Sequence, residues 1–135
     1  ASILGFKVNI SAPIGFKLNT SQLPKDKNCL EFFQDPMDAA AGADIVTTDT
    51  WKSTGYDEDN EKRLGNFARW QVTPEVMSAA KTDAMFMHCL PAFRGQEVSA
   101  EVIDGPQSVV WDEAENRMHI QKAIMEYLLL GKLDE

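Results

Sequence analysis

The alternation of apolar and polar positions along the chain predicts five short strands. Each segment is rich in apolar or β-branched residues and is bounded by polar residues, glycine or proline, as is typical of strands in a packed sheet. Segment 6–11 alternates, whereas 84–88 is apolar up to its last residue, which favours a buried strand. The predicted strands are 6–11, 29–33, 43–48, 84–88 and 108–111.

Helices are predicted between these strands from capping residues and from the helical apolar period. Asp35 precedes Pro36 and Thr73 precedes Pro74, which places an N-cap and a first-position proline at two helix starts. The longest pattern carries an apolar stripe and stops before Gly131. The predicted helices are 36–41 ending at Gly42, one starting at Pro74, a short helix or turn over 97–103, and 113–130, while a helix over 60–67 is left open within the polar loop 49–65.

Strands and helices alternate along the chain, and this order predicts an α/β fold. A Rossmann-like parallel sheet flanked by helices on both faces is the expected architecture, in a single domain. Ligands bind such sheets at the carboxyl ends of the strands. Two polar segments stand in that position, 49–55 after strand 43–48 and 88–95 after strand 84–88.

Charge and composition exclude several classes of function. The 135 residues, enough for one domain, carry a net charge of −8, so nucleic acid is not an expected partner. No apolar run approaches the ~20 residues that a membrane span needs. The two cysteines and two histidines match no metal-ligand spacing, and glycine-rich phosphate loops are absent from the sequence. No metal and no cofactor are therefore expected, and few cysteines favour a reducing compartment.

The first residues suggest a fragment. Residues 1–5 read as the end of a helix that leads directly into the first strand. Neither an initiator methionine nor a signal-peptide pattern stands there. The chain is therefore expected to be N-terminally truncated.

Two polar residues after predicted strands are candidates for chemistry, each with a simpler alternative. Cys89 follows strand 84–88, where a cysteine is either reactive or an inert apolar residue. Its neighbour His88 points to the opposite face of the strand, so the two are not expected to form a nucleophile–base pair. Asp49 follows strand 43–48 and either holds an ammonium group or caps a turn.

Arg94 and Arg117 are the basic candidates for an anionic or carbonyl oxygen. Arg117 stands near the start of the last helix, where a cation opposes the helix dipole. Its alternative role is to pair with the acidic residues around it, which are Asp112, Glu113 and Glu115.

Three segments of the sequence carry motifs that match a known protein family. Residues 85–95, MFMHCLPAFRG, resemble the HCLP segment of that family, and 97–117, EVSAEVIDGPQSVVWDEAENR, resemble the stretch that follows and closes with A-E-N-R. Residues 42–55, GADIVTTDTWKSTG, are similar to the family's G-A-D-x-x-x-T-D-x-W-x-S-M-G. The chain thus resembles ornithine carbamoyltransferases from about residue 42 to residue 130, and HCLP with AENR at this spacing is highly specific.

The resemblance implies that residues 1–135 are an ornithine-binding domain without the carbamoyl-phosphate-binding domain. The family transfers the carbamoyl group of carbamoyl phosphate to the δ-amino group of ornithine, giving citrulline and phosphate in arginine metabolism, without a cofactor. Its active sites lie between two domains and between subunits of a homotrimer. The implied compartment is the cytoplasm, or the mitochondrial matrix in a eukaryote.

The resemblance also implies roles for individual residues. Cys89 would lie near the reacting δ-amino group, and Arg117 would contact the carbamoyl oxygen. The implied substrate-binding residues are Asp49 and Ser53 at the α-amino end of ornithine, Thr54 through its backbone, Leu90 through its carbonyl near the carbamoyl nitrogen, and His88.

The sequence departs from the family's pattern in ways that leave alternatives open. Thr54 stands where ornithine enzymes usually have methionine, and the phosphate-binding S-x-R-T motif is absent from these 135 residues. A carbamoyltransferase for another amine such as putrescine is one alternative, although Asp49 would then have no α-amino group to hold. A non-catalytic binding domain is another. The isolated chain is expected to be inactive.

Overall fold

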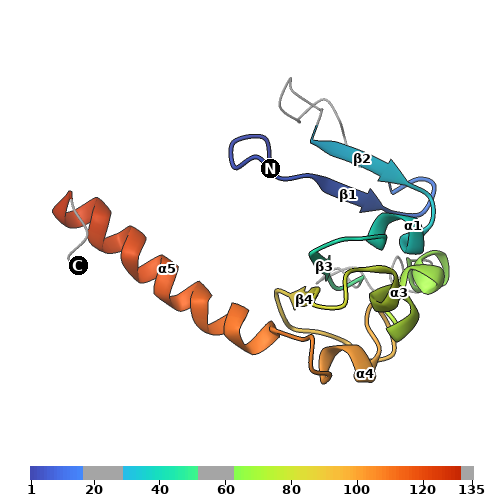
Figure 1. Ribbon diagram of the computed structural model, residues 1–135. Helices are drawn as coiled ribbons and strands as arrows, with labels where there is room; N and C mark the ends of the chain where they lie inside the picture. Colours follow the sequence, from blue (N-terminus) through green and yellow to red (C-terminus); the bar gives the residue numbers. More distant parts are fainter. Residues whose placement is uncertain (17–28, 52–62, 132–135) are drawn as a thin grey trace.

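Four strands form two parallel pairs in the computed structural model, which describes residues 1–16, 29–51 and 63–131 (Figure 1). Strands β1 and β2 pair with Val8 opposite Leu30, and β3 and β4 pair with Ile45 opposite Met85. The strands are β1 (Val8–Ser11), β2 (Leu30–Phe33), β3 (Ile45–Thr48) and β4 (Met85–His88).

Parallel strands flanked by helices confirm the predicted α/β fold. The strands are split between two sheets, however, where one sheet was expected, because no described strand hydrogen-bonds to a member of each pair. The helices are α1 (Pro36–Ala40), α3 (Pro74–Ala79), α4 (Ala100–Ile103) and α5 (Val110–Leu130); residues 63–67 are also helical and lead into the 3₁₀ turn η2 (Ala68–Trp70).

The capping signals at α1 act as predicted. The carboxylate of Asp35 accepts a hydrogen bond from the backbone N–H of Met37 at 2.8 Å, and Pro36 opens the helix. Gly42, just past the helix, has a φ of 66°, a left-handed conformation that glycine adopts without steric cost. Local residue chemistry therefore determines both ends of α1.

The predicted strand 108–111 is wrong. Ser108 forms a single parallel bridge with Phe86, and α5 begins at Val110. The valine pair favours a strand locally, but the backbone of Val109 already turns with a ψ of 24°. Acidic Asp112 and Glu113 then occupy the first helical turn, where the helix dipole favours negative charge.

The core lies around β4, whose Phe86 side chain is completely buried. Alternate residues of β4 face it, as expected of a strand: Phe86 and His88 are buried, whereas Met85 is exposed. Helices α3 and α4 contribute their apolar faces to the same cluster. Its buried members are Ala40, Val46, Val72, Val76, Met77, Ala84, Phe86, Val98, Val102, Ile103 and Val110.

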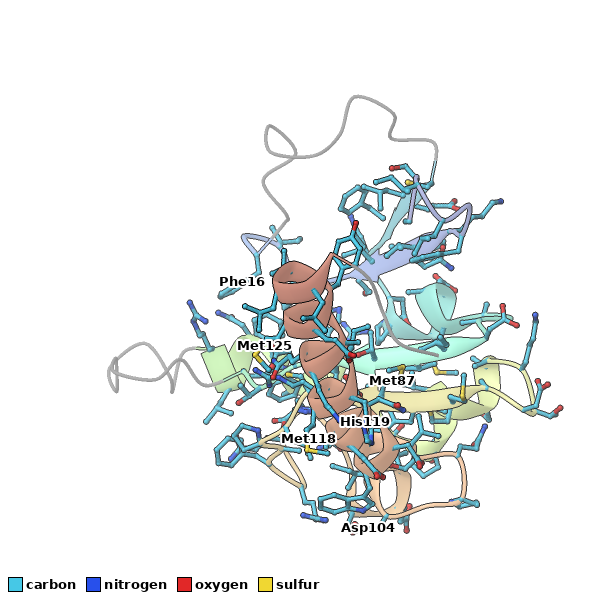
Figure 2. All side chains as sticks on the ribbon, turned by 90° about the vertical axis from the view of Figure 1, so that its left-hand side faces the viewer. Phe16, Met87, Asp104, Met118, His119 and Met125 are labelled. Carbon is cyan, nitrogen blue, oxygen red and sulfur yellow. The ribbon has the colours of Figure 1, made fainter. Side chains whose placement is uncertain are left out.

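Helix α5 extends from the core, and most of its length stands away from the other described elements (Figure 1). Figure 2 looks onto this helix and shows the side chains of Met118, His119 and Met125 on its surface. Large apolar side chains of α5 are exposed at Met118, Ile120, Ile124, Met125, Tyr127, Leu128, Leu129 and Leu130. None of the helices in the described ranges has the length and apolarity that crossing a membrane requires.

Candidate functional site

Asp49 and Cys89 meet where β3 and β4 end. The two strands are parallel neighbours and Thr48 lies opposite His88, so the residue that follows each strand emerges at the same edge. The Cys89 thiol donates a hydrogen bond to Asp49 Oδ1 at 3.3 Å, and the backbone N–H of Thr50 donates to the same oxygen at 2.7 Å. The structure thus brings together two candidate residues that lie 40 positions apart.

The surroundings of Cys89 keep its thiol protonated. Partial burial of the sulfur raises the pKa of the thiol, although the residue as a whole is exposed. Asp49 raises this pKa further through its hydrogen bond and its negative charge, and the charge of Glu113 adds to the effect. Because a cysteine is nucleophilic as the thiolate, Cys89 is suited to donate a hydrogen bond and to orient a substrate.

His88 is buried and braces the turn that follows β4. Its Nδ1 accepts a hydrogen bond from the backbone N–H of Leu90 at 2.9 Å. As an acceptor, Nδ1 carries no proton, so the proton of the neutral ring is on Nε2. That nitrogen faces Glu97 Oε1 at 3.3 Å, and both side chains are completely buried.

Glu97 also holds this turn in place, and the sequence analysis did not identify this residue. Its Oε1 also accepts a hydrogen bond from the backbone N–H of Phe93 at 2.6 Å. A glutamate before an apolar segment is usually exposed, so the sequence carried no signal that this one is buried. With His88, it ties both ends of segment 90–93 to the core.

Leu90 adopts an uncommon backbone conformation. Its φ is 52°, in the left-handed region that residues with a side chain rarely occupy, and the peptide bond to Pro91 is cis. The hydrogen bond from its N–H to His88 and the packing of its side chain against the core hold this conformation. His88 is thus buried beneath Leu90 and holds the Leu90 backbone. Its predicted contact with substrate stays a prediction.

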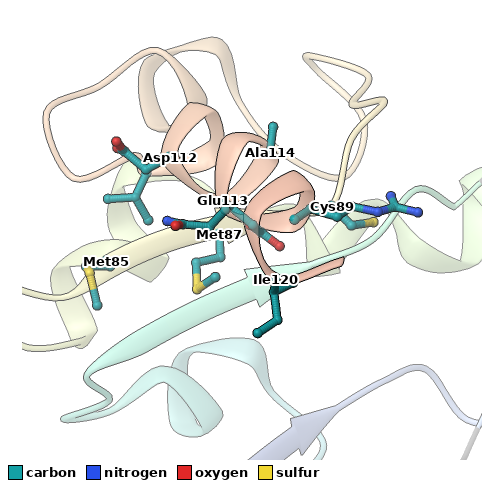
Figure 3. A pocket seen from close by; sticks show the side chains of 10 residues that line it. Met85, Met87, Cys89, Asp112, Glu113, Ala114 and Ile120 are labelled. Carbon is teal, nitrogen blue, oxygen red and sulfur yellow. The ribbon is translucent and has the colours of Figure 1, made fainter. Parts of the chain in front are cut away.

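Arg117 shares a pocket with Cys89. The pocket, of about 580 Å³, lies between the exposed face of β4 and the first turns of α5. Figure 3 shows Met87, Cys89 and Glu113 in its lining, and Arg117 lines it as well. Among the described residues, Arg117 forms no ion pair with the acidic residues around it: Glu113 accepts a hydrogen bond from the backbone of His88, and Glu115 lies against His119.

The remaining candidates are the second arginine, two residues of the polar loop and any possible metal ligands. Arg94 forms two hydrogen bonds to Asp104, at 2.8 and 2.6 Å, on the surface, so it serves as a structural ion pair. Ser53 and Thr54 lie outside the described residues. Within residues 1–16, 29–51 and 63–131, no three His, Cys, Asp or Glu side chains gather as a metal site would require.

In this α/β domain a carboxylate and a thiol meet at the ends of two parallel strands, and a guanidinium from the neighbouring helix α5 lines the pocket beside them. The family model of the aspartate/ornithine carbamoyltransferase Asp/Orn binding domain matches residues 1–128. The chain belongs to the aspartate/ornithine carbamoyltransferase family, as its resemblance to ornithine carbamoyltransferases indicated.

Relatives in sequence and structure agree. The chain is 58% identical over 134 residues to an ornithine carbamoyltransferase of Burkholderia lata, covering 98% of the chain and 43% of the relative. The crystal structure of ornithine carbamoyltransferase from Burkholderia thailandensis matches with a TM-score of 0.86 and 52% identity, over 98% of this chain and 42% of that one. The enzyme from Pyrococcus furiosus matches with a TM-score of 0.81 and 42% identity, over 91% and 42% of the two chains. The chain thus spans less than half the length of these relatives.

Proposed function

We propose that this chain is the ornithine-binding part of an ornithine carbamoyltransferase. In this reaction the δ-amino nitrogen of ornithine attacks the carbonyl carbon of carbamoyl phosphate. A C–N bond forms, the bond from carbon to the phosphate oxygen breaks, and the amine loses a proton, giving citrulline and phosphate. The contact between Asp49 and Cys89 beside the pocket of Arg117, in a chain of this family, is the observation that carries the proposal.

Asp49 binds the α-amino group of ornithine in this proposal. A carboxylate at the end of a strand offers a charge-assisted hydrogen bond to an ammonium group. Its Oδ1 is already oriented by the N–H of Thr50 and the thiol of Cys89, so little reorganisation accompanies binding. Ser53 and Thr54 are proposed to contact the same end of the substrate.

The protonated thiol of Cys89 suits the attack. The δ-amino group must be neutral to react, and a thiolate beside it would stabilise its charged form instead. The raised pKa of Cys89 avoids that opposing charge. The thiol orients the amine, and no covalent intermediate on sulfur is invoked.

Arg117 and Leu90 bind the carbamoyl group. The carbonyl oxygen gains negative charge as the tetrahedral centre forms, and a preorganised guanidinium stabilises that charge. The Leu90 carbonyl accepts a hydrogen bond from the carbamoyl nitrogen. The buried His88–Glu97 pair holds the Leu90 turn in place, and this positioning of two substrates lowers the barrier further.

The assembled enzyme is proposed to contain more than this chain. The relatives are more than twice as long as the matched segment, and the proposed parent supplies a carbamoyl-phosphate-binding domain. It is proposed to act in arginine metabolism as a homotrimer in the cytoplasm, or in the mitochondrial matrix if the source is eukaryotic.

The test is citrulline formation by the full-length parent protein, with Asp49→Ala and Cys89→Ala as variants. Each variant is expected to lower kcat/KM by about 100-fold or more, the usual scale for groups that position or stabilise the reacting centre. Asp83→Ala and Cys29→Ala are matched controls, because Asp83 is exposed and Cys29 lies just before β2, in the other strand pair from the Asp49–Cys89 contact.

A folded parent protein that forms no citrulline would refute the proposal. Carbamoyl-putrescine formation by that protein would favour the alternative substrate that Thr54 raises. Absence of both products would favour a non-catalytic binding domain.

A further inference from the structure

On the edge of β4 that faces away from β3, backbone groups form a series of hydrogen bonds. The last acceptor in this series is a side chain. Amides along a strand point alternately to its two edges, and Met85 donates its N–H toward Asp44 on the β3 side. Phe86 faces the other edge, where its N–H donates to the carbonyl of Gln107 at 2.8 Å and its carbonyl accepts from Val109 at 3.0 Å. The next outward N–H is that of His88, and Glu113 Oε2 accepts it at 2.9 Å.

The carboxylate of Glu113 thus replaces the carbonyl of a neighbouring strand. The main chain that pairs with Phe86 turns into α5 at Val110, so no backbone oxygen from that segment continues the row. His88 is 1% exposed, and a buried N–H without an acceptor is strongly disfavoured. The bond from Glu113 therefore satisfies β4 and attaches the first turn of α5 to it.

Arg117 lies one helical turn beyond that attachment. Residues four apart lie on one face of a helix, and Glu113 and Arg117 both line the pocket that contains Cys89. Farther along α5, Met118 and Ile120 are 60% and 58% exposed. In the described part of the chain, the bond from the His88 amide to Glu113 joins the first turn of α5 to β4.

We propose that Glu113 is a positioning residue, which sets the Arg117 guanidinium beside the Cys89 end of β4 by binding the His88 amide. This inference rests on the proposed carbamoyl transfer for its kinetic consequence. Glu113 contacts no reacting atom in it. The attachment needs an oxygen that accepts the hydrogen bond of the His88 amide more than it needs a negative charge. Glutamine at position 113 should therefore preserve it, whereas alanine should not.

The kinetic test uses the full-length parent protein with Glu113→Ala and Glu113→Gln. Alanine is expected to lower kcat/KM for carbamoyl phosphate by about 30-fold, whereas glutamine keeps roughly a third or more of it. Glu115→Ala is the matched control, since Glu115 lies on the same helix and pairs with His119 instead. Equal losses with alanine and glutamine would overturn the inference.

A double-mutant cycle shows whether Glu113 acts through Arg117. Arg117→Lys keeps a cation but loses the planar guanidinium. If Glu113 works by placing that group, Glu113→Ala lowers kcat/KM by less than about a further 3-fold in the Arg117→Lys background. Independent, multiplicative losses would contradict the inference.

Amide hydrogen exchange separates this inference from the proposed reaction. In the folded parent protein, the His88 amide is expected to exchange at least about 10-fold faster in Glu113→Ala than in wild type, and to stay protected in Glu113→Gln and Glu115→Ala. A parent that makes no citrulline while showing this pattern would refute the reaction and leave the attachment standing. Unchanged exchange in Glu113→Ala would refute the attachment, whatever the activity.

Discussion

Asp49 and Cys89 each have an ordinary alternative role when considered alone, and their contact is what makes them the candidate site. The parallel register of β3 and β4 places the two residues side by side after the strands end. Together with partial burial, their hydrogen bond raises the pKa of the thiol, and it fixes the position of the carboxylate oxygen that accepts it. A nucleophilic cysteine would require the opposite electrostatics.

Cys89 is expected to react slowly with alkylating reagents at neutral pH. Its pKa is raised by partial burial and by Asp49, so the thiolate fraction stays small until the pH exceeds the value of about 8.5 for a free cysteine. Asp49→Asn removes the negative charge, which lowers this pKa and speeds alkylation at a given pH. The measurement is the rate of iodoacetamide labelling of the Cys89 peptide against pH, by mass spectrometry.

Asp83→Asn serves as the control for this labelling, since Asp83 is exposed and does not raise the pKa of Cys89. It should leave the profile unchanged. If the labelling rate of the wild-type protein reaches its midpoint at a lower pH than that of a free cysteine, Cys89 is an activated thiol, contrary to this structure.

Among the elements, the short helix α4 and its exit illustrate how tightly the core segments pack. Ser99 caps α4, accepting a hydrogen bond from the N–H of Val102 at 3.3 Å, and Val102 and Ile103 enter the core. The chain then turns at Gly105 toward the segment that pairs with β4. At this turn a Cβ on Gly105 would clash with the backbone carbonyl oxygen of Glu101.

Gly105→Ala is therefore expected to destabilise the protein by about 1–3 kcal/mol, the usual cost of forcing an extra methyl group into packed surroundings. Gly65→Ala is the matched control, because Gly65 lies in a helical segment with open space around its Cβ position. That change should be neutral or slightly stabilising, since alanine favours helix over glycine by about 1 kcal/mol. Thermal unfolding of the parent protein compares the two, and equal midpoints would contradict the steric argument.

The molecule as a whole contains the residues of only one side of the proposed reaction. Asp49, Cys89 and Arg117 suit the proposed ornithine and carbamoyl contacts, while the phosphate-binding S-x-R-T motif is absent from these 135 residues. Many large apolar side chains along α5 are exposed, as is typical of an interaction site. The chain also covers only 43% of its Burkholderia lata relative.

The 135-residue chain alone is expected to form no citrulline, because catalysis by positioning requires both substrates to be held. The measurement is citrulline formation by the purified chain with ornithine and carbamoyl phosphate. The full-length parent at the same concentration is the positive control, and circular dichroism checks that the isolated chain is folded. Citrulline above the uncatalysed rate would refute this expectation.

Local patterns in the sequence determined the elements whose causes are local. The cap at Asp35, the proline at the start of α3 and the stop of α5 at Gly131 all act over a few residues, and each was predicted correctly, although the side chain of Thr73 makes no capping hydrogen bond. The HCLP and AENR segments indicated the family for the same reason, since motif spacing is a property of the chain itself. The error at 108–111 arose where a local preference for strand opposed the demands of the fold.

Tertiary structure alone decided which residues meet. Asp49 with Cys89, His88 with Glu97, and Glu113 with the His88 amide are pairs separated along the chain, and strand register and helix placement bring them together. Burial decided their chemistry as well: the same glutamate that would be solvated on a surface becomes, at position 97, a buried partner of histidine. Contacts and desolvation depend on the packed chain, so a linear pattern of residues cannot specify them.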